Sequence, residues 1–274
     1  MKSKLSIIAL LSIFLLSCSG GKMEEKQVDY NALKDVPASA WEKLSKKKIY
    51  FGHQSVGFNI IDGVKDIIKE NPAIKLNIVE TSSPSDFNKG VFAHSRVGKN
   101  TDSKSKVDEF LKFLKNGIGK HVDIAFLKFC FIDVSAGTEV QENFEYYKKY
   151  ISQLNIEYPE TTFIHITVPL TTMKTTWKTR LKIAIGKEEI WEYDDNIRRN
   201  EYNRLLIKEY TNKEPVFDIA AIESTFSDGT SCTFEKNGKL YSSMVPEYTN
   251  DGGHLNKTGQ KKVAEQLLLL LANL

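Results

Sequence analysis

This sequence of 274 residues has little of three features that would assign it at once to a specialised class of protein. Three cysteines are too few for a small fold held together by disulfides, and Cys130 and Cys232 can pair only if the fold brings them together. The 38 basic and 35 acidic residues give a net charge of only +3, so we expect no nucleic-acid partner. No apolar run reaches the roughly 20 residues that crossing a membrane requires. With 41% hydrophobic residues, the chain is predicted to be globular and long enough for one α/β domain.

The first 17 residues are predicted to be an export signal rather than part of the fold. Lys2 and Lys4 form a charged start before an apolar run, residues 5–16, which has the length of a secretory signal. The ending Leu-Leu-Ser-Cys resembles the lipobox of bacterial lipoproteins, which implies that Cys18 becomes the first mature residue and carries a lipid. We therefore expect residues 18–45 to be a lipidated tether and the protein to be held in the cell envelope, outside the cytoplasmic membrane. A plain signal peptide and an uncleaved anchor are the alternatives.

Residues 46–274 are predicted to form a single domain in which strands and helices alternate. Five short apolar runs predict strands, at residues 49–51, 75–80, 122–131, 162–168 and 216–219. Apolar residues at helical spacing predict helices at residues 56–69, 105–116, 144–154, 197–210 and 258–271. Such alternation is typical of βαβ units, so we expect a five-stranded, mostly parallel sheet with helices on both faces. Ligands bind beyond the carboxyl ends of the strands in sheets of this kind.

Ser55 lies just past the first predicted strand and directly before a predicted helix. A hydroxyl at this place lies at the carboxyl edge of the sheet, close to the free N–H groups of a helix N-terminus, which stabilise an oxyanion. Taken alone, the residue is more simply explained as the cap of that helix.

A second segment offers Ser55 the partners that a nucleophile needs. A catalytic serine requires a base, and the base requires a carboxylate that fixes its tautomer. Asp251 stands three residues before His254, across two glycines, and can fold back onto the imidazole ring. Because this loop follows the fifth predicted strand, we expect it at the same edge of the sheet as Ser55.

Together these segments resemble the SGNH, or GDSL, hydrolases, which carry a serine after strand one and an Asp-x-x-His before the last helix. The resemblance covers residues 47–272 and implies a flavodoxin-like three-layer α/β sandwich, for which we expect no cofactor. It implies that Ser55 is the nucleophile, His254 the base and Asp251 the partner of the base. The chain departs from the family at the first block, which reads Gly-His-Gln-Ser instead of Gly-Asp-Ser.

The same resemblance implies which groups bind the oxyanion. Ser55 supplies its own N–H, and Gly98 best matches the glycine of the second block, with Gly90 as the alternative. The third block lacks its asparagine, because residues 128–133 read Lys-Phe-Cys-Phe-Ile-Asp. The third donor is therefore missing or comes from another part of the chain.

The remaining histidines have more than one interpretation. His53 and His94 fall at the predicted active edge, where they bind substrate, supply the missing donor or face solvent. Alternatively, both histidines converge with His254 and Asp251 on a zinc ion that activates water. No pair of them has compact metal-ligand spacing, so we expect no metal. His165, inside the fourth predicted strand, is expected to be a packed core residue.

The long connection at residues 169–196 carries Trp177, which we expect to contact substrate. The segment either covers the active edge and selects a carbohydrate or acidic substrate, or forms a surface helix packed by its tryptophans. We expect a monomeric serine esterase that removes O-acyl groups, chiefly acetyl, from a small-molecule or glycan ester. An O-acetyltransferase uses the same chemistry with a sugar hydroxyl in place of water. A non-catalytic glycan-binding protein on the same scaffold is the alternative of a different class.

Overall fold

The computed structural model describes residues 30–173 and 191–274, without the side chains of residues 191 and 192. The predicted export signal, the lipid-bearing Cys18 and the substrate-contacting Trp177 therefore lie outside the described residues. Within the described ranges, none of the helices has the length and apolar character needed to cross a membrane.

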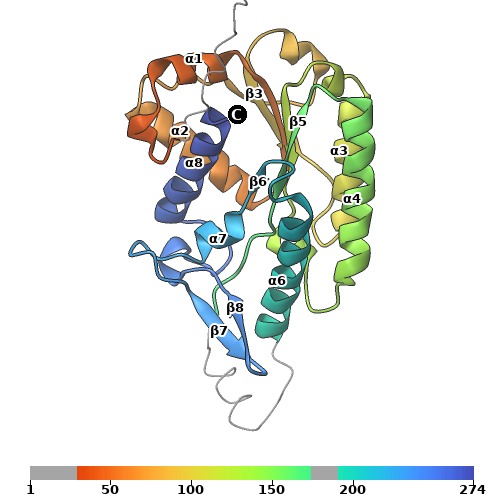
Figure 1. Cartoon of the computed structure of the whole chain (residues 1–274), viewed down its shortest axis with the longest axis vertical. Coiled ribbons are helices and arrows are strands. Elements are labelled where there is room, and N and C mark those ends of the chain that lie inside the picture. Colours follow the sequence, from red (N-terminus) through yellow and green to blue (C-terminus); the bar gives the residue numbers. More distant parts are fainter. Residues whose placement is uncertain (1–29, 174–190) are drawn as a thin grey trace, which may run out of the picture.

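A six-stranded sheet lies at the centre of the domain (Figure 1). Its order is β2-β3-β1-β4-β5-β6, and every neighbouring pair is parallel. The strands are β1 (Lys48–His53), β2 (Ile78–Glu80), β3 (Val91–Arg96), β4 (Ile124–Leu127), β5 (Thr162–Ile166) and β6 (Val216–Phe217). Without the short edge strand β2, this is the 2-1-3-4-5 order of flavodoxin-like folds. A separate antiparallel hairpin joins β7 (Thr233–Lys236) to β8 (Lys239–Ser242).

Helices cover both faces of the sheet, so the domain has three layers (Figure 1). One face carries α1 (Ala38–Lys46), α2 (Val56–Glu70), α7 (Ile219–Glu223) and α8 (Lys257–Ala272). The other carries α3 (Ser103–Lys115), α4 (Val140–Glu157) and α6 (Trp191–Tyr210). Short 3-10 turns occur at Leu33–Asp35, Pro84–Asn88, Ile118–Lys120, Phe131–Asp133 and Pro246–Tyr248.

The sequence of β1 explains why it lies in the middle of this sandwich. Ile49 and Phe51 belong to the apolar core beneath α2 and α8, whereas Tyr50 belongs to the core beneath α3 and α4. The Tyr50 ring stacks on Phe110 of α3, with 5.7 Å between ring centroids. A strand covered on both faces is apolar at successive positions instead of at every second one, as residues 49–51 of β1 are here.

The three-layer α/β fold confirms the prediction, with corrections to the sheet. The predicted strand at residues 75–80 is only the short edge strand β2, and the strand next to β1 is β3, which the prediction missed. The hairpin β7–β8 was missed as well. Cys130 is buried, and both Cys130 and Cys232 are free, so the possible disulfide does not form.

The strand order places one edge of the sheet where a ligand site is expected. The chain leaves β1 toward β3 on one side and later toward β4 on the other, so β1 lies at the topological switch point. In open parallel sheets ligands bind beyond the carboxyl ends of the strands at this point. The residues that follow β1, β3 and β4 therefore surround the position that Ser55 occupies.

Candidate active site

Ser55 forms the turn between β1 and α2 in a strained conformation. Its φ of 51° and ψ of −111° are unusual for a residue with a side chain. The side chain makes no capping hydrogen bond to α2, so the simpler explanation of Ser55 as a helix cap is wrong. Instead, Oγ lies 2.5 Å from Nε2 of His254. The turn thus directs the hydroxyl away from the helix that it precedes.

His254 is held on its other side by Asp251, as the sequence suggested. Nδ1 of His254 lies 2.6 Å from Oδ2 of Asp251. The second carboxylate oxygen, Oδ1, accepts hydrogen bonds from the backbone amides of Gly253 at 2.9 Å and His254 at 2.8 Å. Burial raises the pKa of Asp251, but these two amides and the His254 ring outweigh it and hold the pKa well below its ordinary value. Asp251 is therefore an anion fixed against the imidazole.

The two glycines between Asp251 and His254 are needed for different reasons. Gly252 has a φ of 100°, in the left-handed region that residues with side chains rarely adopt. Gly253 lies against the ring of Phe131, and a Cβ there would come within 2.7 Å of that ring. The Phe131 ring also packs edge-on against the His254 ring, with 5.5 Å between centroids. The loop can bring His254 to Ser55 only because neither position carries a side chain.

Two residues that sequence analysis did not single out tie the Ser55 turn to its neighbours. Oδ1 of Asn59, in the first turns of α2, accepts a hydrogen bond from the amide of Leu255 at 3.2 Å. Nε2 of Gln54 donates to the carbonyl oxygens of Val97 at 3.0 Å and Gly98 at 2.5 Å. These contacts join the Ser55 turn to the His254 loop and to the loop after β3.

The structure contradicts the predicted role of Gly98 as an oxyanion donor. Its N–H donates to Oε2 of Glu109 on α3, 2.5 Å away, and is not free. Gly98 is a glycine for a packing reason: its φ is 59°, and a Cβ would come within 2.4 Å of the Lys106 amide. The alternative, Gly90, stands just before β3 and contacts Ser45 at the opposite end of the strand. The amide of Ser55 has no such partner among the described contacts.

His53 and His94 do not reach the site, so the prediction that they contact substrate is wrong for this structure. They are 0% and 2% exposed, and Nε2 of His53 lies 3.0 Å from Nδ1 of His94. Both rings pack edge-on against Phe58 of α2. Burial is the main cause that lowers the pKa of each ring. They pair with each other beneath α2 instead of converging with His254, and the described residues hold no cluster of metal-ligating groups.

A buried ion pair braces the two loops that flank Ser55. Nζ of Lys106 lies 2.5 Å from Oδ2 of Asp133, and neither side chain is exposed. Asp133 also accepts hydrogen bonds from the amides of Cys130 at 2.6 Å and Thr101 at 2.9 Å. The sequence placed Asp133 next to the missing asparagine but gave no sign of this role. The carboxylate links the loop after β3 to the loop after β4.

An open cavity of about 420 Å³ lies beside His254. Phe131 and Ile132 form an apolar wall, and Thr171, Thr172 and Asp195 add polar groups. Its remaining lining residues are Ser135, Arg199, Asp251, Gly252, Gly253 and His254. The cavity has the size of a small-molecule site and reaches the Asp251–His254 loop.

Arg199 of α6 organises the far wall of this cavity. The guanidinium is 3% exposed and donates to the carbonyl oxygens of Phe131 at 2.8 Å and Val134 at 3.0 Å. It also donates to Oγ1 of Thr171 at 2.8 Å. Burial lowers the pKa of Arg199 to about 10. Sequence analysis missed this role, because an arginine in a helix is ordinarily exposed and is buried only where the fold supplies it with partners.

The chain is similar to one protein family and to several solved structures. The family model of the GDSL-like lipase/acylhydrolases matches residues 50–267. A protein from Streptococcus pneumonia named for platelet activating factor is 16% identical, with a TM-score of 0.47 over 87% of this chain and 94% of that one. A GDSL-like lipase from Bacteroides thetaiotaomicron is 14% identical, with a TM-score of 0.44 over 83% and 89%. The periplasmic domain of a lipopolysaccharide acetyltransferase from Salmonella ser. Paratyphi A is 12% identical, with a TM-score of 0.43 over 81% and 82%. No curated protein matches the chain.

Proposed function

Because the chain belongs to the GDSL-like lipase/acylhydrolase family, we propose that it hydrolyses an ester through Ser55, His254 and Asp251. The observation that carries the proposal is the continuous path from Oγ of Ser55 through the His254 ring to Asp251, with contacts of 2.5 and 2.6 Å. These are the distances at which a base takes a proton from a nucleophile while a carboxylate fixes its tautomer.

The reaction proceeds in two halves. Oγ of Ser55 attacks the ester carbonyl carbon while Nε2 of His254 takes the hydroxyl proton, which leaves a negative charge on the carbonyl oxygen. The ester bond breaks, the proton on Nε2 passes to the departing alcohol, and the acyl group stays on Ser55. A water molecule then gives a proton to Nε2 of His254 and attacks the acyl carbon. The bond from this carbon to Ser55 breaks, the acid leaves, and the proton on Nε2 passes to Oγ, which restores the hydroxyl.

The amide of Ser55, at the start of α2, is the donor that we assign to the oxyanion. The helix start adds a positive electrostatic potential there. Two of the family's three donors are missing here, the Gly98 amide and the third-block asparagine. Each such loss slows catalysis by roughly two to three orders of magnitude, unless another group of the chain takes its place.

The position of the cavity beside His254 indicates which part of the ester it holds. His254 delivers a proton to the departing oxygen, so the alcohol leaves on the His254 side, where the cavity of about 420 Å³ opens. An apolar wall with polar groups at its margin suits a sugar ring, which has C–H faces and a rim of hydroxyls. We assign this cavity to the sugar of an O-acylated, chiefly O-acetylated, carbohydrate.

Access of water favours hydrolysis over transfer to a second sugar. The side chain of His254 is 46% exposed, so solvent reaches the place where the acyl-enzyme is cleaved. We further propose that the domain works as a monomer in the cell envelope, held to a membrane by a lipid on Cys18. Mass spectrometry of the mature protein and of a Cys18→Ala variant tests that part, because the lipid mass is expected only on the first.

Hydrolysis of 4-nitrophenyl acetate by the purified protein tests the activity. We expect turnover that disappears in Ser55→Ala and in His254→Ala, and covalent labelling of wild-type Ser55 by a fluorophosphonate. Cys232→Ser is the matched control, because it makes a similarly small change to a side chain that lies outside the site. Unchanged turnover in Ser55→Ala would remove the proposed nucleophile. A folded wild type without turnover that still binds glycans would favour the non-catalytic alternative.

A further inference from the structure

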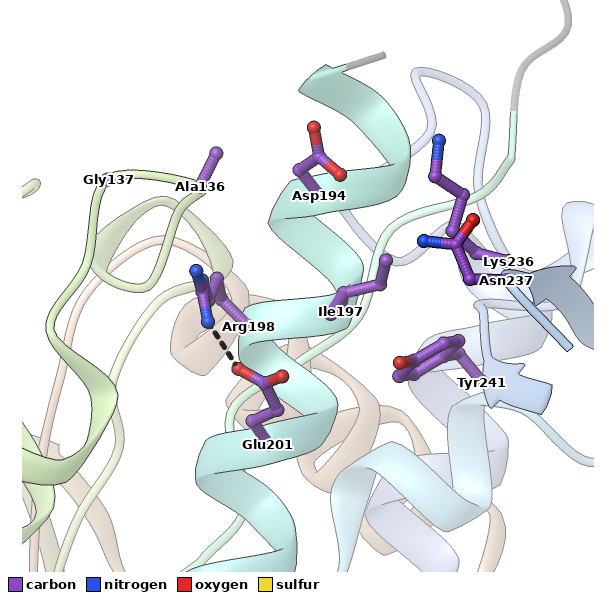
Figure 2. Close-up of a pocket in the computed structure, with 9 residues that line it drawn as sticks. All are labelled: Ala136, Gly137, Asp194, Ile197, Arg198, Glu201, Lys236, Asn237 and Tyr241. Carbon is purple, nitrogen blue, oxygen red and sulfur yellow. Dashed lines mark hydrogen bonds and ion pairs between the residues drawn. The ribbon is translucent and has the colours of Figure 1, made fainter. Parts of the chain in front are cut away.

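A second cavity, of about 450 Å³, lies between α6 and the hairpin β7–β8, outside the site described above (Figure 2). Asp194, Ile197, Arg198 and Glu201 of α6 line it, together with Lys236, Asn237 and Tyr241 of the hairpin. Ala136 and Gly137, from the loop before α4, complete the wall.

The second cavity lies near the first one, because residues adjacent in the chain line the two. Ser135 and Asp195 line the cavity beside His254, whereas the adjacent residues Ala136 and Asp194 line the second cavity. The amide of Ala136 donates to Oδ1 of Asp195 at 2.7 Å, which holds the loop before α4 against α6 between the two cavities. A chain-like ligand whose ester lies at Ser55 can therefore pass over this contact into the second cavity.

The chemistry of the second cavity selects a neutral, polar ligand. Its two basic and two acidic side chains cancel in formal charge, and Arg198 pairs with Glu201 at 2.8 Å. A strongly anionic ligand finds no excess of positive charge here, and a long acyl chain would have to lie among charged groups. The side chain of Ile197 and the edge of Tyr241 supply apolar surface, and the Tyr241 hydroxyl points toward α6 (Figure 2).

The hairpin holds two of the polar groups in fixed places. Asn237 and Gly238 form its turn with φ values of 52° and 72°, which is the geometry of a tight two-residue hairpin. Tyr241 is 8% exposed, and its ring stacks on Phe234 with 5.6 Å between centroids. The Asn237 amide and the Tyr241 hydroxyl are therefore presented by a turn and a ring that are already ordered.

We propose that the second cavity is a subsite for a further sugar unit of an oligosaccharide whose ester is cleaved at Ser55. The inference rests on the proposed function for the position of the ester, but binding of a sugar in the cavity can be measured without catalysis. The subsite makes an extended carbohydrate a better substrate than a single acetylated sugar, because binding of the distant unit positions the ester.

Gly137 allows the cavity to be filled without disturbing the fold. A side chain at this position would meet nothing within 4 Å, so Gly137→Trp projects an indole into open space. Ile156→Trp is the matched control, because Ile156 is 82% exposed on α4. Asn237→Gly removes the amide and suits the left-handed turn, and Tyr241→Phe removes only the hydroxyl.

The experiment compares 4-nitrophenyl acetate with O-acetylated xylotetraose. We expect Gly137→Trp to raise KM for the tetrasaccharide about tenfold and to leave kcat/KM for 4-nitrophenyl acetate within about twofold of wild type. Asn237→Gly and Tyr241→Phe are expected to act in the same direction, and Ile156→Trp to change neither substrate. Equal effects on both substrates, or none on the tetrasaccharide from any of the three cavity variants, would overturn the subsite.

Binding distinguishes failure of the subsite from failure of the proposed function. We expect unmodified xylotetraose to bind Ser55→Ala in calorimetry, and the double variant Ser55→Ala with Gly137→Trp to bind at least about tenfold more weakly. If wild type hydrolyses neither ester but this difference in binding remains, the subsite stands and the catalytic proposal fails. If hydrolysis proceeds and the two variants bind equally, only the subsite fails.

Discussion

The hydroxyl of Ser55 lies 2.5 Å from Nε2 of His254, although 199 positions separate the two residues in the chain. The contact depends on a strained backbone at Ser55, whose φ is 51°. Conformations of this kind cost of order 1–3 kcal/mol and persist where the surrounding structure holds them. The site therefore gains its geometry at the expense of stability.

Replacement of Ser55 by glycine is expected to stabilise the protein while activity is lost. Glycine adopts positive φ without strain, so Ser55→Gly is expected to raise the free energy of unfolding by about 1 kcal/mol. Ser55→Ala removes the same hydroxyl but keeps the Cβ, which makes it the matched control. Chemical denaturation of the three proteins measures the difference. A glycine variant no more stable than the alanine variant would show that the turn is not strained.

Asp251→Asn is expected to abolish most of the activity without unfolding the loop. The amide can still accept from the Gly253 and His254 backbones, but it no longer holds an anion against Nδ1 of His254. In Ser-His-Asp sites this change lowers kcat by roughly four orders of magnitude. Steady-state kinetics on 4-nitrophenyl acetate measures it, with the exposed Asp228→Asn as control. A loss below about tenfold would mean that Asp251 does not orient the base.

Much of this arrangement could be predicted from the sequence because it follows from chain order and local pattern. Alternation of strands and helices placed Ser55 after β1 and the Asp251–His254 loop before α8, and parallel strands bring such loops to one edge. The spacing of Asp251 and His254 allowed their contact. The structure brings all three side chains together.

What could not be predicted depends on long-range packing. His53 and His94 occur at the right end of their strands, but only the packing of α2 over them decides that they are buried. β3 was missed, since His94, Ser95 and Arg96 make its end polar. By contrast, the hairpin β7–β8 had a local signal, the Asn237-Gly238 turn, which sequence analysis overlooked.

Gln54 is expected to act as a positioning residue for the Ser55 turn. In Gln54→Glu an oxygen replaces Nε2 and faces the carbonyl oxygens of Val97 and Gly98, so two hydrogen bonds become repulsive contacts. We expect kcat to fall at least about tenfold with a smaller change in KM, and fluorophosphonate labelling to slow in parallel. The exposed Gln266→Glu is the control. If stability falls but the labelling rate of the folded protein does not, Gln54 is only structural.

The buried pair of His53 and His94 is expected to make stability depend on pH. Burial lowers the pKa of each ring in the folded protein below its unfolded value of about 6.5. Below that pH the unfolded chain binds more protons, so stability is lost as the pH falls from 7 to 5.5. Each histidine adds up to about 1.4 kcal/mol per pH unit to this slope. Denaturation across this range is expected to give a shallower slope for His94→Asn but not for the exposed His121→Gln; equal slopes would contradict the assignment.

The ion pair between Lys106 and Asp133 is expected to be the most sensitive point of the scaffold below the site. Lys106→Met leaves a fully buried carboxylate without its cation, which costs about 3–5 kcal/mol. Adding Asp133→Asn removes the unpaired charge and keeps an acceptor for the Cys130 and Thr101 amides, so the double variant is expected to recover part of the loss. Denaturant unfolding measures both, with the exposed Lys46→Met as a control that changes little. A double variant as unstable as Lys106→Met alone would show that packing of the lysine stem, and not the buried charge, determines the cost.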